Sequence, residues 1–323
     1  MKNVKNIVFS VVLLAISTLL ALAFGEVVLR VKNSSMKNYD IEMWRYAKEL
    51  KVRSDIPLLG HEHAPSSKAL LQSVDIRTNE LGLRGGPLAP PRPDVRRILF
   101  LGSSVTLGWG VPEDETVTAR LEKMFAADGQ QVEVLNAGIG NYNAPRYVER
   151  FLTRLSSVKP TDIVVHYFLR DAETLDAGGG NVLLRNSELA VTTWVALSRY
   201  LGKSGEKSLV DHYKAVYEPQ AQGFKDMHAA LARLADYCKR NHIRLYLAMT
   251  PDVHDLVDYR FDFVHKQIHA LADELGYVYV DQLPAMRNLT PKEMWSMPGD
   301  PHPNGLGHQR MAEAIYPTLR LVK

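Results

Sequence analysis

Five short apolar runs recur along the chain from residue 98 onward, and segments with helical periodicity separate them. The runs cover residues 98–101, 132–135, 163–168, 245–249 and 278–280. The helical patterns cover residues 115–127, 145–157, 211–241, 259–275 and 306–321. Strands that alternate with helices favour a parallel sheet, because each parallel strand needs a crossover connection. The sequence therefore predicts an α/β fold, a three-layer, doubly wound sandwich around a five-stranded parallel sheet.

A long uncharged segment lies near the N-terminus. Lys2 and Lys5 precede 19 residues without a charge, Ile7 to Gly25 (25 − 7 + 1). This length suffices for one transmembrane helix, and the preceding lysines favour a cytoplasmic N-terminus. Ala21-Leu22-Ala23 would instead suit signal cleavage and secretion, although the run exceeds the roughly 7–15 residues usual for a signal peptide. We expect a single-pass inner-membrane protein whose main domain lies in the periplasm, with a secreted protein as the alternative.

We expect three parts in the chain. Residues 1–32 form a membrane anchor or signal segment, 33–93 an irregular juxtamembrane stalk, and 94–323 the α/β domain. The boundary near 94 follows from the proline-rich segment 87–93, which is typical of an extended linker. Residues 172–210, with Ala177-Gly-Gly-Gly180, interrupt the α/β pattern as an insertion. A mobile lid and a surface loop with a short packed helix both remain open interpretations.

Charge and cysteine content exclude some partners and chemistries. The formal net charge is +3, and basic and acidic residues are mixed without a long basic run, so we expect no nucleic-acid partner. Cys238 is the single cysteine, which rules out an intrachain disulfide, and its helical surroundings predict a buried, inert thiol. The oligomeric state stays open.

Two separate motifs carry chemistry. Ser104 follows the first apolar run in Gly102-Ser103-Ser104, where a helix is expected to begin. Asp300 and His302 share one loop ahead of the last helix. Ligands of doubly wound sheets lie at the carboxyl ends of the strands, which is where the first motif falls. We therefore expect one site built from both motifs.

These residue types fit nucleophilic catalysis. A serine hydroxyl becomes reactive when a base takes its proton, and His302 is the best-placed base. Asp300 would hold the imidazole tautomer and stabilise the imidazolium. Acyl transfer also needs N–H groups directed at the developing oxyanion, and the amides of Ser104 and Gly138 are candidates. The predicted catalytic residues are Ser104, Asp300 and His302.

Other candidates surround this site. Arg170 has three interpretations: a cationic oxyanion donor, a clamp for an acidic group of the substrate, or a structural partner of Asp171. The rings of Trp109 and Tyr142 could stack on a sugar, although aromatic residues near loops also form core edges. The candidate substrate-binding residues are Trp109, Asn141, Tyr142 and Asp171.

We expect neither a metal nor a cofactor. His265 and His269, and likewise His61 and His63, have spacings that can hold a metal, but neither pair has a third ligand nearby in the sequence. A flavin protein also has hydroxyl residues after its first strand, but Asp300 and His302 would then have no role.

At these residues the chain resembles the SGNH, or GDSL-like, hydrolase superfamily over roughly residues 75–320. The segment Asn79-x-x-Gly82-x-Arg84 also resembles the one before the first motif in membrane-anchored members. The resemblance implies a flavodoxin-like fold with strand order 2-1-3-4-5. It also implies that Ser104 is the nucleophile, that its amide and that of Gly138 form the oxyanion hole, and that Asp300 and His302 complete the triad.

The chain departs from the superfamily pattern at three points. Gly102-Ser103-Ser104 replaces Gly-Asp-Ser, which keeps the nucleophile. Phe168-Leu169-Arg170-Asp171 replaces Gly-x-Asn-Asp, so Arg170 stands where the resemblance places an oxyanion donor. The aspartate precedes the histidine by two positions rather than three.

The resemblance implies a serine esterase that cleaves O-acyl esters, foremost O-acetyl, through an acyl-serine intermediate, and the N-terminal segment predicts that it acts outside the cytoplasm. Its substrate would be an acylated small molecule or polysaccharide. An O-acyltransferase results if a sugar hydroxyl resolves the intermediate. A non-catalytic glycan-binding or assembly protein that has kept the fold is the contrasting alternative.

Overall fold

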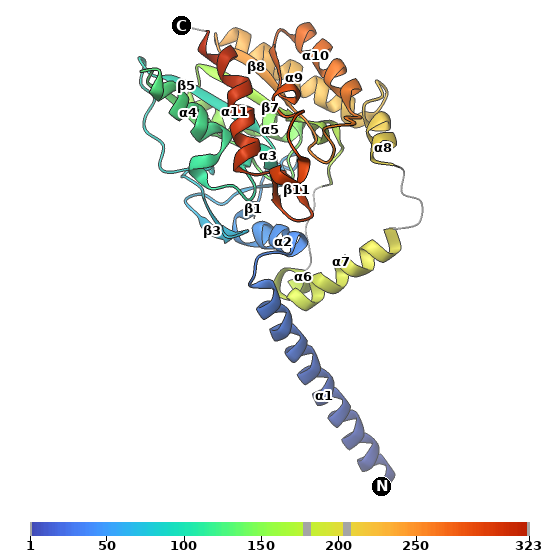
Figure 1. The fold of residues 1–323 in the computed structure, drawn as a ribbon. Coiled ribbons are helices and arrows are strands. Elements are labelled where there is room, and N and C mark those ends of the chain that lie inside the picture. The colour runs from blue at the N-terminus through green and yellow to red at the C-terminus, as the bar shows by residue number, and fades with distance from the viewer. Residues whose placement is uncertain (1, 177–181, 203–207, 322–323) are drawn as a thin grey trace. The chain divides into compact units, whose positions relative to one another are not determined.

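The computed structural model describes residues 2–176, 182–202 and 208–321. They form two compact units, one of residues 2–48 with 182–202 and one of residues 49–176 with 208–321. The second unit contains the sheet and the predicted site, and each unit is described below by itself (Figure 1).

The second unit is built on a five-stranded sheet with the order β6-β5-β7-β8-β9. All neighbouring strands run parallel. Numbered along the chain, this is the order 2-1-3-4-5, so the predicted α/β architecture is confirmed. The strands are β5 (Arg96–Gly102), β6 (Val132–Asn136), β7 (Asp162–Phe168), β8 (Arg244–Thr250) and β9 (Val278–Asp281).

The central strands are buried on both faces. Six of the seven residues of β5 and of β7 are buried, without the alternation typical of a half-exposed strand. Helices supply the cover: α4 (Val117–Ala127) packs against α11 (Gly305–Arg320), and α9 (Gln222–Arg240) packs against both α5 (Ala144–Arg150) and α10 (Asp262–Leu275). Figure 1 shows α4 and α11 side by side.

Two predicted helices are shorter than expected. The pattern at 211–241 forms α8 (Leu209–Val216) and α9, with a break around Pro219. Proline lacks an N–H and disfavours helical backbone at the preceding residue, which explains the break. The pattern at 145–157 gives α5, then a π-helical turn (Phe151–Leu155) and a 3₁₀ turn (Ser156–Val158).

The segment before the sheet belongs to the same compact unit as the sheet. It contains the hairpins β1 (Lys51–Arg53) with β2 (His61–His63) and β3 (Lys68–Leu71) with β4 (Val74–Arg77). Buried Arg84 pairs with Asn136 of β6, and its guanidinium donates to the carbonyls of Leu107, Gly108 and Val111. These bonds tie the segment to the sheet, and both lie in the compact unit of residues 49–176 and 208–321.

The first unit consists of helices α1 (Lys2–Asn33), α2 (Tyr39–Glu49), α6 (Val182–Asn186) and α7 (Glu188–Gly202). Residues Val4–Asn33 are long and apolar enough to cross a membrane, with a mean hydropathy of 2.7, as a signal sequence near the N-terminus also would be. The insertion predicted at 172–210 thus contains α6 and α7. Its Ala177–Gly180 stretch lies outside the described residues.

Candidate active site

Ser104 lies at the tight turn between β5 and α3 (Ser104–Leu107). Gly102 ends the strand, and a Cβ atom there would lie 2.0 Å from Thr106 Oγ1 and 2.8 Å from the carbonyl oxygen of His166. The helix ends at Gly108, whose φ of 78° is left-handed. Glycines on both sides therefore let this short turn hold Ser104 at the carboxyl end of the sheet.

Asp300 and His302 lie on β11 (Asp300–Pro303), which forms a hairpin with β10 (Trp295–Met297). Immediately afterwards, the side chain of Asn304 accepts bonds from the amides of Leu306 and Gly307 and so caps α11. The cap fixes where the loop ends and the helix begins. It therefore holds the strand that carries both side chains.

The structure brings the three predicted catalytic residues into one hydrogen-bonded chain. His302 Nε2 lies 2.8 Å from Ser104 Oγ, and His302 Nδ1 lies 2.5 Å from Asp300 Oδ1. The amide of His302 also donates to Asp300 Oδ1 over 3.1 Å. The two-residue spacing that departs from the superfamily pattern thus still permits contact.

Asp300 is fully buried and receives donors on both oxygens. Its Oδ2 accepts from Trp109 Nε1 at 3.2 Å and from Gln72 Nε2 at 2.8 Å. Burial raises the pKa of this carboxyl, but the bonds from His302 and Gln72 outweigh it and hold the pKa below the usual value. The group at this position is therefore a carboxylate.

The two aromatic candidates differ from the prediction because both rings are buried. Trp109 is 1% exposed and donates to Asp300, and Tyr142 is 2% exposed and donates to the carbonyl of His61. Neither presents a face on which a sugar could stack. Asn141 is exposed, with a left-handed φ of 64°, and its carbonyl accepts from Arg146.

Arg170 and Asp171 point to different partners from those expected. The Arg170 side chain is half-exposed and pairs with Glu173 at 3.1 Å, three residues along the 3₁₀ turn η4 (Leu169–Ala172). Asp171 is fully buried and accepts from the amide of Phe168 and the hydroxyl of Tyr147. Burial raises its pKa to about 8, which suits a structural carboxylic acid rather than an exposed substrate ligand.

Gly138 lies where two backbones approach closely. A Cβ atom there would lie 2.2 Å from the backbone nitrogen of Leu107, so only glycine fits. Its N–H donates to Asn136 Oδ1 at 3.0 Å. The structure thus engages this amide in a local turn rather than directing it at an oxyanion.

The candidate metal histidines have other partners. His265 bonds Asp281 and Tyr259, while His61 and His63 bond the carbonyls of Gly140 and Gly82. Among the described residues, no group of three or more His, Cys, Asp or Glu side chains could hold a metal. Cys238 is buried, and burial raises its thiol pKa to about 12, as expected of an inert cysteine.

Two features near the site were missed from the sequence. Gln72, from the β3–β4 hairpin, donates to the triad carboxylate, and no sequence motif around Gln72 predicts this contact. Beyond β8, His254 Nδ1 bonds buried Asp252 at 2.8 Å and repeats the Asp-x-His spacing of Asp300 and His302. The repeated Asp-x-His spacing could have predicted this second bonded pair from the sequence.

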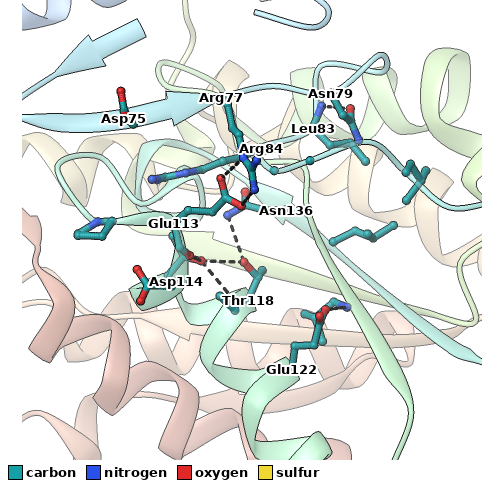
Figure 2. Close-up of a pocket in the computed structure, with 18 of the residues that line it drawn as sticks. Asp75, Arg77, Asn79, Leu83, Arg84, Glu113, Asp114, Thr118, Glu122 and Asn136 are labelled. Carbon is teal, nitrogen blue, oxygen red and sulfur yellow. Dashed lines mark hydrogen bonds and ion pairs between the residues drawn. The ribbon is translucent and has the colours of Figure 1, made fainter. Parts of the chain in front are cut away.

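A cavity of about 890 Å³ lies between the β3–β4 hairpin, the Arg84 loop and the start of α4 (Figure 2). Its walls carry both charges, and Arg77 forms an ion pair with Glu113 across it. Neither Ser104 nor His302 lines this cavity. It is therefore separate from the hydrogen-bonded chain described above.

A comparison with protein families covers the residues of this site. The model of the GDSL-like lipase/acylhydrolase family matches residues 100–310, which include Ser104, Asp300 and His302. The chain belongs to this family. Membership supports an ester hydrolase, and a match of this length includes all five strands of the sheet except the start of β5.

Solved structures similar to this chain include several hydrolases. TesA is 17% identical, with 71% of this chain and 100% of that chain covered and a TM-score of 0.46. The acetylxylan esterase Axe2 of Geobacillus stearothermophilus is 16% identical (68% and 92% covered, TM-score 0.43). The psychrotrophic esterase EstA of a Pseudoalteromonas species is 15% identical (70% and 99%, TM-score 0.42). No curated protein sequence matches the chain.

Proposed function

We propose that this chain is a membrane-anchored serine esterase that acts outside the cytoplasm on O-acyl esters, foremost O-acetyl groups of a polysaccharide. The observation that carries the proposal is the hydrogen-bonded chain from Ser104 through His302 to Asp300. Family membership supports the ester bond as the target. The apolar run in helix α1 and the lysines before that run support a location outside the cytoplasm.

In the proposed reaction His302 Nε2 takes the proton of Ser104 Oγ as the oxygen attacks the acyl carbon. The imidazolium that forms is stabilised by Asp300 at Nδ1, and it then protonates the leaving alcohol. The amide of Ser104, at the start of α3, is the oxyanion donor that we assign. Water next attacks the acyl-serine with His302 as base, which releases the acid and restores the serine.

The first test is hydrolysis of p-nitrophenyl acetate by the full chain in detergent. We expect steady release of nitrophenol and acetate, because an activated serine attacks this small ester without needing a bound glycan. Acetate release from acetylated xylan and from acetylated monosaccharides then defines the acceptor. Activity on small esters with none on acetylated glycans would contradict the polysaccharide part of the proposal.

The same assay separates hydrolysis from transfer. Adding a sugar acceptor and measuring its acetylation reveals whether a hydroxyl competes with water for the acyl-serine. A folded protein that neither releases acetate nor reacts covalently with a fluorophosphonate would contradict the esterase proposal and favour a binding protein.

A further inference from the structure

Helix α7 has two apolar faces, and its own compact unit covers one of them. On the covered face Val191 is 7% exposed, and Val195 lines a small pocket together with Ile41 of α2. On the other face Trp194, Leu197 and Leu201 recur at helical spacing and are 56%, 47% and 67% exposed. We call these three residues the outer face of α7.

The start of α7 is bound to the last turns of α1. The carboxylate of Glu26 accepts bonds from the amides of Glu188 and Leu189 and from the hydroxyl of Ser187. Two turns later, Asn33 donates to the Glu188 carboxylate at 2.8 Å. Figure 1 shows α6 and α7 at this end of α1.

These bonds place α7 at a definite level along α1. Glu26 directly follows the uncharged run that ends at Gly25, so the bonded end of α7 lies where a spanning helix would leave the hydrocarbon. Leu189 also packs where Gly25 has no side chain, 3.6 Å from the position of a Cβ atom. Tryptophan and tyrosine are enriched at this interfacial level, and α7 carries exposed Trp194 and Tyr200.

We propose that the outer face of α7 lies on the phospholipid bilayer, so that the insertion forms a second, interfacial membrane contact beside the transmembrane helix. A helix with an apolar stripe and an interfacial tryptophan suits this position, because the stripe enters the acyl boundary while the polar side stays in water. The insertion then rests α7 on the membrane surface, while α1 of the same unit crosses the bilayer.

The test uses the full chain with a fluorescent probe on single cysteines at position 197 or 201, made as Leu197→Cys and Leu201→Cys with Cys238→Ala. Val257→Cys is the matched control, since Val257 is an apolar side chain of the second unit that is 86% exposed. In phosphatidylcholine vesicles that contain brominated lipid, we expect quenching at 197 and 201 and none at 257.

Equal, weak quenching at all three positions would overturn the proposal. So would probes at 197 and 201 that are shielded from water in detergent but unquenched by brominated lipid, because another protein surface would then cover the outer face. A Trp194→Glu variant gives a second measurement: we expect weaker lipid quenching at both α7 positions with the α1 span still inserted.

A second inference concerns Gln72, and it rests on the function proposed above. Gln72 and Ser73 form the two-residue turn of the β3–β4 hairpin, with left-handed φ values of 50° and 62°. Turns of this type favour glycine or asparagine, so glutamine here is a strained choice. The turn carries Gln72 Nε2 to 2.8 Å from Asp300 Oδ2.

Gly110 makes room for this contact. Its φ of 73° is left-handed, and a Cβ atom there would lie 2.1 Å from Gln72 Oε1. Met297, on the strand that pairs with β11, lies 3.1 Å from Gln72 Nε2 through its sulfur. The tip of the hairpin therefore fits between the nucleophile loop and the loop of the triad carboxylate.

We infer that Gln72 is a positioning residue of the active site, supplied by a hairpin that lies before the family-matched residues 100–310. It donates to the triad carboxylate and fixes the carboxyl plane so that Oδ1 faces His302. Gln72 does not touch the reacting atoms, so its effect passes through Asp300 and His302.

The test compares Gln72→Ala and Gln72→Glu with Asp75→Asn, a control on the same hairpin whose exposed carboxylate pairs with Lys68. We expect Gln72→Ala to lower kcat about tenfold with KM changed less than about twofold, since a lost bond to a charged group is of this size. Gln72→Glu should lower kcat further, because a carboxylate cannot donate to Asp300. Asp75→Asn should match the parent.

A second measurement, by proton NMR, does not depend on turnover. The proton between His302 Nδ1 and Asp300 should give a downfield proton resonance, and we expect it to move in Gln72→Ala and stay in Asp75→Asn. An unmoved resonance with an unchanged kcat would overturn the role of Gln72. An inactive parent whose resonance still moves in Gln72→Ala would count against the esterase function and leave the positioning role standing.

Discussion

Ser104→Ala is expected to abolish ester hydrolysis and covalent reaction with a fluorophosphonate, while the folded structure persists. The substitution removes only the hydroxyl group. Among the described residues, the partner of this hydroxyl is His302 Nε2, 2.8 Å away. Loss of a serine nucleophile in comparable sites costs about 10⁴-fold or more in kcat, and the remaining activity comes from binding and the oxyanion donor. Rates on p-nitrophenyl acetate and intact-protein mass after labelling measure the effect.

Ser103→Ala is the matched control, because Ser103 is the adjacent hydroxyl in the same turn and makes no side-chain bond that caps α3. Ser103 is buried, but its hydroxyl is not part of the bonded chain from Ser104 to Asp300, so we expect this variant to be labelled and to turn over within about threefold of the parent. A Ser104→Ala protein that still hydrolyses the ester, or is still labelled, would exclude Ser104 as the nucleophile.

The sheet was predictable because its strands are buried on both faces. Such strands appear in the sequence as uninterrupted apolar runs, and the five runs became β5 to β9 in the expected order. The helical pattern at 211–241 was read as one helix because periodicity alone does not register how strongly Pro219 interrupts it. The structure of the insertion was harder to predict, because α6 and α7 pack on α1, which lies more than 150 residues away in the sequence.

The site was predictable where the fold itself brings residues together. Ser104 follows a central strand, and the loop of Asp300 and His302 precedes the last helix, so both reach the carboxyl edge of the sheet. The partners of these residues were not predictable. Trp109 was open to two interpretations, a ring that stacks on a sugar or a core edge, and neither includes its bond to Asp300 from 191 positions away; Gln72 donates to Asp300 from 228 positions away.

Arg170 had three open interpretations, two of them directed at the substrate and one a structural pair with a nearby carboxylate, and the structure shows a local pair. The family pattern places an oxyanion donor at this position. In the structure, the η4 turn brings Glu173 within one turn of Arg170, and these two side chains form an ion pair. Exposed pairs of this kind contribute little to stability, about 0–1 kcal/mol. A sequence pattern gives the position of such a residue, and the local turn decides its partner.

Asp300→Asn should lower kcat by about 10⁴-fold, as the same change does in a serine protease triad, with a smaller change in stability. The physical reason lies in the four bonds to the carboxylate. If the new amide N–H₂ faces Gln72 and Trp109, donors meet donors. If it faces His302 instead, Nδ1 must accept, the ring proton moves to Nε2, and Ser104 loses its base.

The first orientation keeps the tautomer of His302 but is disfavoured by Gln72 and Trp109, and the second leaves Ser104 without a base, so a change that favours the first orientation should restore activity. Adding Gln72→Glu to Asp300→Asn supplies an acceptor for the N–H₂ group and lets the amide oxygen face His302, so the double variant should recover part of the lost kcat. The measurements are kcat and KM on p-nitrophenyl acetate, with thermal unfolding as the check on folding. An Asp300→Asn protein with near-parental kcat would show that the carboxylate does not set the tautomer of His302, and the proposed mechanism would then lose its third member.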